Sequence, residues 1–219
     1  HTRIGWYRAV YAIFWGFAYG VFTDELAEKA GVDTETMLRR LYDSNSNPKQ
    51  AEQVRRSKGV LDLVVAQSGY GKALPEGEGI GIAVHHSFQS YVAMAVHVRM
   101  KGDDFEVLRV DSAVDCGQVL NKDGATAQQE GAVAMGISLA KYCEVSFENG
   151  AVVNSNFHDY PVMRINDMPD VHVHFVDSDA KPTGLGEPGM APFAPALSNA
   201  IYQASGKRHR SLPIQPMRT

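Results

Sequence analysis

The chain has 219 residues, of which 44% are hydrophobic and 21% are charged, so it is long enough for one sizeable folded domain or two small ones. Its net charge of -4 gives no basic excess of the kind that binds nucleic acid, and we expect no nucleic-acid partner. Cys116 and Cys143 lie far apart and lack a CxxC spacing, which excludes a zinc site or an iron–sulfur cluster built from the cysteines of this chain.

The first third of the chain is predicted to be helical. The apolar run from Val10 to Phe22 is too short, and too rich in glycine and aromatic residues, to span a membrane. We expect it to form a buried helix that ends near Gly31. No signal peptide precedes this run, and motif-bearing residues follow directly after His1, so we expect a fragment or a processed piece of a longer protein.

Two further helices are expected before the chain changes character. Asp33 is a candidate N-cap for a short helix, and residues 48–68 have the apolar spacing of a longer one. A loop with proline and glycine follows, and β-branched and aromatic residues become frequent after it. We therefore divide the chain into a helical segment, residues 1–78, and an α+β segment, residues 79–219.

Strand-forming residues dominate the centre of the chain. Residues 80–84, 91–99 and 105–114 carry partly alternating β-branched and aromatic side chains, which predicts an antiparallel unit. The sequence Lys101-Gly102-Asp103-Asp104 predicts the turn between the last two of these strands. Asn149-Gly150 predicts a second hairpin further along the chain.

Residues 171–176 form another predicted strand that carries two histidines. His172 and His174 would share one face of this strand, because they are two residues apart. Such a pair can share a metal ion, and the alternative is a purely structural role. No fixed spacing of further ligands supports the metal site.

Residues 127–132 read Ala-Gln-Gln-Glu-Gly-Ala and lead into an alanine-rich stretch that predicts a helix. An amide such as Gln128 donates and accepts hydrogen bonds without charge, and a helix N-terminus favours polar or anionic groups. At a helix start, such an amide would therefore suit a contact with a polar or anionic group. The alternative is a glutamine that caps a core helix, and the local pattern leaves both interpretations open.

One carboxylate, Glu187, stands alone in the stretch from Gly184 to Pro195. The glycines of this stretch permit close approaches that a Cβ atom would block, and Pro188 biases Glu187 towards an extended conformation. A helix follows, with Pro195 expected in its first turn and Gly206 at its end. An acid on such a turn suggests a positioned catalytic group, and the alternative is a structural loop with a solvated glutamate.

Several motifs resemble one family in the same order along the chain. They are Gly5-Trp6-Tyr7-Arg8, Val114-Asp115-Cys116-Gly117, Gln128-Gln129-Glu130-Gly131, Gly186-Glu187-Pro188 and Lys207-Arg208-His209-Arg210-Ser211-Leu212-Pro213. The pattern is similar to the C-terminal part of the molybdenum-binding subunit of the xanthine oxidase family, in the branch of isoquinoline 1-oxidoreductase beta subunits and aldehyde dehydrogenases. The resemblance implies an α+β fold, with a helical first third followed by mixed antiparallel strands and helices.

The resemblance also implies roles for individual residues. In the family, the glutamate of Gly-Glu-Pro is the base beside the molybdenum centre, and this role falls on Glu187. Arg8, Gln128, Gly131 and Gly186 fall where family members approach the molybdopterin cofactor. No side chain of this chain is expected to bind the metal directly.

The sequence departs from the family near Arg8. Many relatives have a glycine close after this arginine, whereas this chain has Ala9. Tyr11, Phe14 and Trp15 make the following segment more aromatic, which implies a reshaped substrate pocket.

The function implied by the resemblance is that of part of the large subunit of a molybdenum-dependent oxidoreductase. Such an enzyme oxidises an aldehyde or hydroxylates an N-heteroaromatic compound with oxygen from water. The expected cofactor is molybdopterin with molybdenum, in the cytosine dinucleotide form, and iron–sulfur clusters would lie on a small partner subunit. The remainder of the molybdenum subunit and a cytochrome c electron acceptor are further expected partners, and the resemblance favours the periplasm over the cytoplasm. The alternative is a non-catalytic fragment or degenerate relative with a structural or interface role.

Overall fold

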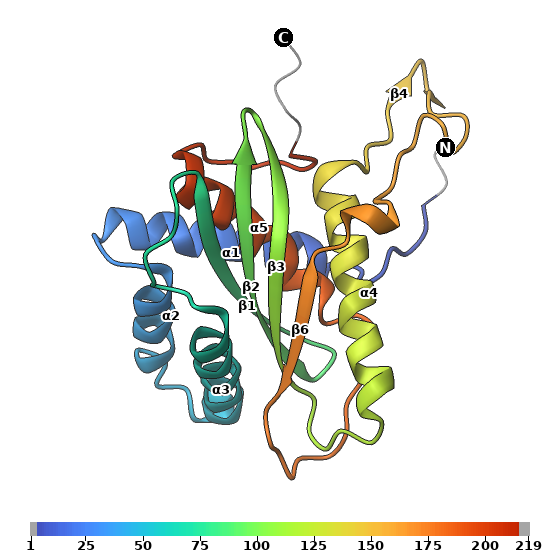
Figure 1. The fold of residues 1–219 in the computed structure, drawn as a ribbon. Helices are drawn as coiled ribbons and strands as arrows, with labels where there is room; N and C mark the ends of the chain where they lie inside the picture. The colour runs from blue at the N-terminus through green and yellow to red at the C-terminus, as the bar shows by residue number, and fades with distance from the viewer. Residues whose placement is uncertain (1–3, 215–219) are drawn as a thin grey trace.

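The computed structural model describes residues 4–214, which form a four-stranded sheet with helices on both faces (Figure 1). The helices are α1 (Ala12–Lys29), α2 (Thr34–Asp43), α3 (Ala51–Ser68), α4 (Lys122–Lys141) and α5 (Met190–Ser205), with short 3-10 turns at Pro48–Gln50 and Ile165–Asp167. The strands are β1 (Glu78–Ser87), β2 (Ser90–Lys101), β3 (Asp104–Asp115), β4 (Phe147–Glu148), β5 (Ala151–Val152) and β6 (Asp170–Phe175). The main sheet has the order β1-β2-β3-β6, and β4 pairs with β5 in a separate hairpin.

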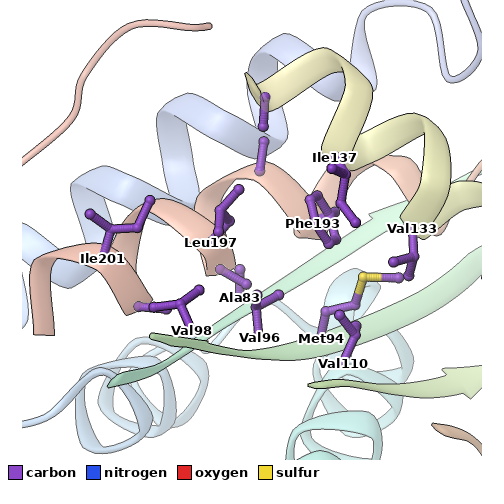
Figure 2. Packing of buried hydrophobic residues seen from close by; sticks show 14 of the residues in the cluster. Ala83, Met94, Val96, Val98, Val110, Val133, Ile137, Phe193, Leu197 and Ile201 are labelled. Carbon is purple, nitrogen blue, oxygen red and sulfur yellow. The ribbon is translucent and has the colours of Figure 1, made fainter. Parts of the chain in front are cut away.

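The strand β2 divides the hydrophobic core, because successive side chains of a strand point to opposite faces of the sheet. Val92, Met94, Val96 and Val98 belong to the cluster formed with α4 and α5. Ala93 and Ala95 belong to the cluster formed with α2 and α3 on the other face. Figure 2 shows the first cluster, to which α5 contributes Phe193, Leu197 and Ile201 and α4 contributes Val133 and Ile137. The helices on the α5 face also carry the site described below.

The antiparallel unit predicted from residues 80–114 is confirmed. β1 pairs with β2 and β2 with β3, both antiparallel, and Gly102 turns between the last two strands with a φ of 65°. The Asn149-Gly150 hairpin is also confirmed, with positive φ angles at both residues. The sequence did not predict that β6 pairs with β3 in parallel. The α+β fold class is confirmed, with this one parallel pairing added to the antiparallel strands.

The expected capping residues are observed. The side chain of Asp33 accepts a hydrogen bond from the backbone N–H of Thr36 at 2.7 Å, so it caps α2 as predicted. Gly31 has a φ of 65° and follows Ala30, the C-cap of α1, whereas Gly206 has a φ of 72° and is itself the C-cap of α5. These positions favour glycine because a Cβ atom disfavours the left-handed region.

The prediction of a buried helix over Val10–Phe22 is wrong for one face of α1. Ala12, Ile13 and Gly16 are buried, whereas the aromatic side chains of Phe14 and Trp15 are exposed. The reason is the arrangement of the apolar residues: the run is apolar on all sides, but only the side with small residues packs against α5.

The prediction that Pro195 lies in the first turn of its helix is also wrong, because α5 already begins at Met190. A proline inside a helix leaves the carbonyl four residues earlier without its usual partner, which here is the carbonyl of Ala191. A Cβ atom on Gly16 of α1 would lie 2.5 Å from this carbonyl oxygen, and one on Gly20 would lie 2.5 Å from the Pro195 ring. α1 therefore packs closely over the part of α5 that the proline disturbs.

The two histidines of β6 have separate partners. His172 Nε2 lies 2.8 Å from Asp170 Oδ2, and His174 Nε2 lies 2.9 Å from Asp111 Oδ1. Among residues 4–214, no group of three or more histidine, cysteine, aspartate or glutamate side chains is arranged to hold a metal ion. The division into residues 1–78 and 79–219 remains a proposal, and β1 begins at Glu78.

Candidate active site

Arg8 connects three segments that lie far apart in the sequence. Its Nε–H donates to the backbone carbonyl of Gly186, and its Nη2 donates to both the backbone oxygen and the side-chain Oε1 of Gln128, at 2.9 and 3.0 Å. Its Nη1 lies 3.6 Å from the sulfur of Met135. Burial lowers the pKa of Arg8, and the nearby Glu187 carboxylate opposes this effect. The guanidinium therefore links α4 to the loop that contains Glu187.

The contact with Arg8 also fixes how the Gln128 amide is oriented. A guanidinium only donates hydrogen bonds, so the amide atom that faces it must be the oxygen. The Nε2 group of Gln128 makes no hydrogen bond within the described part of the chain, and this side chain is exposed. Two amide N–H donors therefore remain free to bind another group.

The carboxylate of Glu187 is held by a backbone donor. Its Oε1 accepts a hydrogen bond from the N–H of Ala9 at 3.0 Å, and its backbone oxygen accepts from Met190 N at 3.0 Å as α5 begins. Ala9 is fully buried and has a φ of 71°, and Val10 has a φ of 47°. Residues with a Cβ atom rarely adopt these angles, and such strained positions occur often at functional sites. The bend directs the Ala9 N–H to the carboxylate.

Hydrogen bonds hold the segment before Glu187 against the end of the sheet. Ser90 Oγ donates to the Gly184 carbonyl at 2.8 Å and lies 2.7 Å from Thr183 Oγ1. Thr183 also bonds to the backbone oxygen of Cys116 through both its N–H and its hydroxyl. Sequence reasoning missed Ser90 and Thr183, and it noted Ala9 only as a departure from the family. The contacts of these residues join distant parts of the chain, and no local motif signals them.

Gln129 lies beneath the same loop and was also missed. Its side chain is fully buried, and its Oε1 accepts a hydrogen bond from Ser112 at 3.1 Å. A Cβ atom on Gly189 would lie 2.6 Å from this oxygen, so glycine is required for the close approach of the loop to α4. The Nε2 atom of Gln129 has no hydrogen-bond partner among residues 4–214. An unsatisfied buried amide of this kind is uncommon and often marks a functional region.

The five residues predicted as site residues therefore lie together, although one detail differs from expectation. A Cβ atom on Gly131 would lie 3.4 Å from Arg8 Nη1, and one on Gly186 would lie 3.9 Å from Gln128 Oε1. Gln128 was expected at a helix start, but α4 begins at Lys122, so Gln128 lies in its second turn. Asn121 caps this helix instead, because its Oδ1 accepts a hydrogen bond from the backbone N–H of Gly124 at 2.9 Å. A cavity of about 360 Å³ adjoins the cluster and is lined by Cys116, Leu120, Gln128, Thr183 and Leu185, among others.

A family model described as a molybdopterin cofactor-binding domain matches residues 25–169. The chain belongs to this family. It corresponds to part of the molybdenum-binding subunit of the xanthine oxidase family, as the resemblance in sequence implied.

Two relatives illustrate the family. The chain is 33% identical over 204 residues to the isoquinoline 1-oxidoreductase subunit beta of Brevundimonas diminuta, and the match covers 91% of this chain and 25% of that protein. It is 32% identical over 227 residues to a protein of Gluconacetobacter polyoxogenes named membrane-bound aldehyde dehydrogenase [pyrroloquinoline-quinone], covering 98% of this chain and 29% of that protein. The chain therefore spans between a quarter and a third of the length of these curated relatives.

Solved structures share the fold. The aldehyde oxidoreductase from Desulfovibrio gigas is similar with a TM-score of 0.72 at 12% identity, over 96% of this chain and 40% of that chain. The quinoline 2-oxidoreductase from Pseudomonas putida 86 is similar with a TM-score of 0.56 at 22% identity, over 59% of this chain and 18% of that chain. At these identities the similarity to the solved structures shows a shared fold and nothing beyond it.

The residues of the site fit the cofactor that gives the molybdopterin-binding family its name. A molybdopterin carries a phosphate and a polar ring system, so its pocket needs cationic and amide donors and little steric bulk. The free Nε2 group of Gln128 provides such donors, and Arg8 places a positive charge beside it. Gly131 and Gly186 carry no side chain of their own, so they add little steric bulk beside Arg8 and Gln128. No helix among the described residues is both long and apolar enough to cross a membrane.

Proposed function

We propose that this chain is the part of a molybdenum-dependent oxidoreductase that contributes the general base, Glu187. The proposed enzyme oxidises an aldehyde or hydroxylates an N-heteroaromatic compound with oxygen from water. The observation that carries the proposal is the convergence of Arg8, Gln128 and the Gly186-Glu187 loop from three separate segments. The names of the relatives, an isoquinoline oxidoreductase subunit and an aldehyde dehydrogenase, support these two substrate classes.

The proposed roles follow from the contacts of each residue. Arg8, Gln128, Gly131 and Gly186 would hold the molybdopterin, which when bound supplies the redox chemistry. Glu187 accepts the proton that is released when the water-derived oxygen attacks an electron-poor carbon. The Ala9 N–H holds one oxygen of this carboxylate, and Arg8 holds the neighbouring Gly186 carbonyl, so the proton acceptor keeps one orientation.

The wider assembly is also part of the proposal. We propose the cytosine dinucleotide form of the cofactor, iron–sulfur clusters on a small partner subunit, and a cytochrome c electron acceptor in the periplasm. The two cysteines of this chain have no cluster-binding spacing, which supports a separate iron–sulfur subunit. The remainder of the molybdenum subunit would complete the site, so the chain by itself is expected to be inactive.

The test of the proposal is the substitution Glu187→Gln in the assembled enzyme. The amide keeps the size of the side chain but lacks basicity, so kcat per bound molybdenum should fall by about 10² or more while the metal content is unchanged. Glu187→Asp should also be impaired, because the shorter side chain withdraws the carboxylate. Glu148→Gln is the control, since Glu148 is exposed on β4, and it should leave kcat unchanged.

A Glu187→Gln enzyme with full molybdenum content and the parent kcat would contradict the catalytic assignment. The chain would then support the alternative of a non-catalytic relative in which Glu187 only shapes the turn before α5. Such a result would leave the cofactor-binding roles of Arg8 and Gln128 to be tested through molybdenum content alone.

A further inference from the structure

We propose that the outer face of α1 is the surface on which the remainder of the molybdenum-binding subunit docks, so that this polypeptide covers one side of the Arg8–Glu187 cluster. We define the outer face by the side chains of Tyr11, Phe14, Trp15, Tyr19 and Phe22. The identity of the partner rests on the proposed function, whereas the existence of the docking surface rests on the structure of α1.

The outer face consists of large aromatic side chains that the described residues leave half or more exposed. Their exposed fractions lie between 50% and 70%. The rings of Trp15 and Tyr19 stack on each other with their centroids 5.6 Å apart, so they form a continuous surface. No charged residue occurs from Val10 to Thr23. Contiguous apolar surfaces of this kind are rare on monomers and mark sites of interaction, and exposed aromatic residues are enriched at interfaces.

The opposite face of α1 shows why the aromatic residues cannot turn inward. A Cβ atom on Gly16 would lie 2.5 Å from the Ala191 carbonyl oxygen, and one on Gly20 would lie 2.5 Å from the Pro195 ring. The spacing between α1 and α5 therefore admits only small residues. Rotation of α1 would bring aromatic rings into this contact, so turning the helix cannot bury the outer face.

The lengths of the relatives support the remainder of the molybdenum-binding subunit as the occupant of this face. The isoquinoline relative is covered over only 25% of its length, and the solved aldehyde oxidoreductase is covered over only 40% although 96% of this chain matches it. In these proteins a larger amount of polypeptide accompanies the same fold. The outer face begins at Tyr11, three residues after Arg8, so a polypeptide docked there adjoins the site.

The charges around α1 disfavour other occupants. The acidic residues at its C-terminal end are paired with arginines that follow α5: Arg208 with Asp24 and Glu28, and Arg210 with Glu25. The outer face itself has no lysine or arginine with which to bind anionic lipid or nucleic acid. An apolar protein surface is the partner that remains.

The test uses two polypeptides from the organism that produces this chain. One is residues 1–219, and the other is the polypeptide that matches the uncovered three-quarters of the isoquinoline relative. The two are expressed separately and then mixed. The double variant Phe14→Ser with Tyr19→Ser should weaken the dissociation constant at least about tenfold, because aromatic residues at an interface centre contribute strongly. Its melting temperature should stay close to that of the parent, because both side chains are exposed. The control is Phe157→Ser, which removes an aromatic side chain that is 84% exposed outside α1 and should leave binding unchanged.

Normal binding by the α1 double variant, or equal weakening by Phe157→Ser, would overturn the proposal. So would self-association of residues 1–219 that the double variant abolishes, because the occupant would then be a second copy. Molybdenum content separates this proposal from the proposed function. A complex that forms through α1 but never holds molybdenum would refute the proposed function and leave the docking surface intact. A double variant that binds with parent affinity and holds molybdenum would refute the docking surface and leave the proposed function intact.

Discussion

Ala9 and Val10 adopt φ angles of 71° and 47°, although neither residue is glycine. The bend is supported by hydrogen bonds from Val10 N to Tyr7 O at 2.9 Å and from Ala12 N to Ala9 O at 2.8 Å. It directs the Ala9 N–H to Glu187, and it leaves Arg8 next to Gln128 and Gly186. At the scale of single residues, the site therefore depends on a strained backbone at two residues that each carry a Cβ atom.

The strain at Ala9 can be measured by comparing Ala9→Gly with Ala12→Gly. Both alanines are buried in the same small cluster. Each substitution removes one buried methyl group and makes the unfolded chain more flexible, so these two effects lower the unfolding free energy of both variants alike. Ala12 lies at the start of α1 with ordinary helical geometry. We expect Ala9→Gly to be more stable than Ala12→Gly by about 1–2 kcal/mol, because only Ala9 occupies the left-handed region. Chemical denaturation measures the difference, and equal unfolding free energies would contradict it.

At the scale of elements, the contact between α1 and α5 positions both sides of the site. α1 begins at Ala12, shortly after Arg8 and Ala9, and α5 begins at Met190, shortly after Glu187. Asn199 on α5 strengthens the contact by donating to the backbone oxygens of Gly20 and Ile82, each at 3.3 Å. A change in the distance between these two helices would therefore move the base relative to the backbone donor that holds it.

The dependence on close packing predicts opposite effects for two glycine substitutions. Gly16→Ala should lower the unfolding free energy by about 1–3 kcal/mol, because the new Cβ atom would lie 2.5 Å from the Ala191 carbonyl oxygen. Gly59→Ala on α3 should raise it by about 0.5–1 kcal/mol, because no atom lies within 4 Å of the new Cβ atom and alanine favours a helix. Thermal unfolding of both variants checks the prediction. Two changes of the same sign would show that the helix contact is not as tight as described.

At the scale of the whole molecule, the sheet brings the scattered segments together. Ser90 at the start of β2 and Cys116 after the end of β3 both contact Thr183, and α4 returns along the sheet to meet Arg8. The same packing buries titratable groups. Burial lowers the pKa of His85 to about 4, and burial also lowers the pKa of His86 and of His209.

These histidines predict how stability depends on pH. The pKa of His85 is about 4 in the folded chain and about 6.5 when unfolded, so the unfolded chain binds more protons between these values. The unfolding free energy should therefore fall as the pH is lowered from about 6.5 to 4, by up to about 3 kcal/mol for His85 alone. Urea denaturation across this range measures the slope. His85→Gln should flatten it, and an unchanged slope in His85→Gln would refute the assignment.

The sequence by itself determined the elements whose signals are local. Apolar spacing and caps such as Asp33 predicted the helices, and alternation with turn glycines predicted the antiparallel strands, because these patterns act within a few residues. Its motifs also identified Arg8, Gln128 and Glu187 as a group.

The tertiary structure alone decided which face of α1 is exposed, where α5 begins and how β6 pairs with β3. Each of these depends on contacts between distant residues, such as Gly16 with Ala191, which no local pattern records. The same holds for Ala9 as the backbone donor to Glu187: its role arises from a positive φ angle that alanine disfavours and that only the surrounding packing maintains.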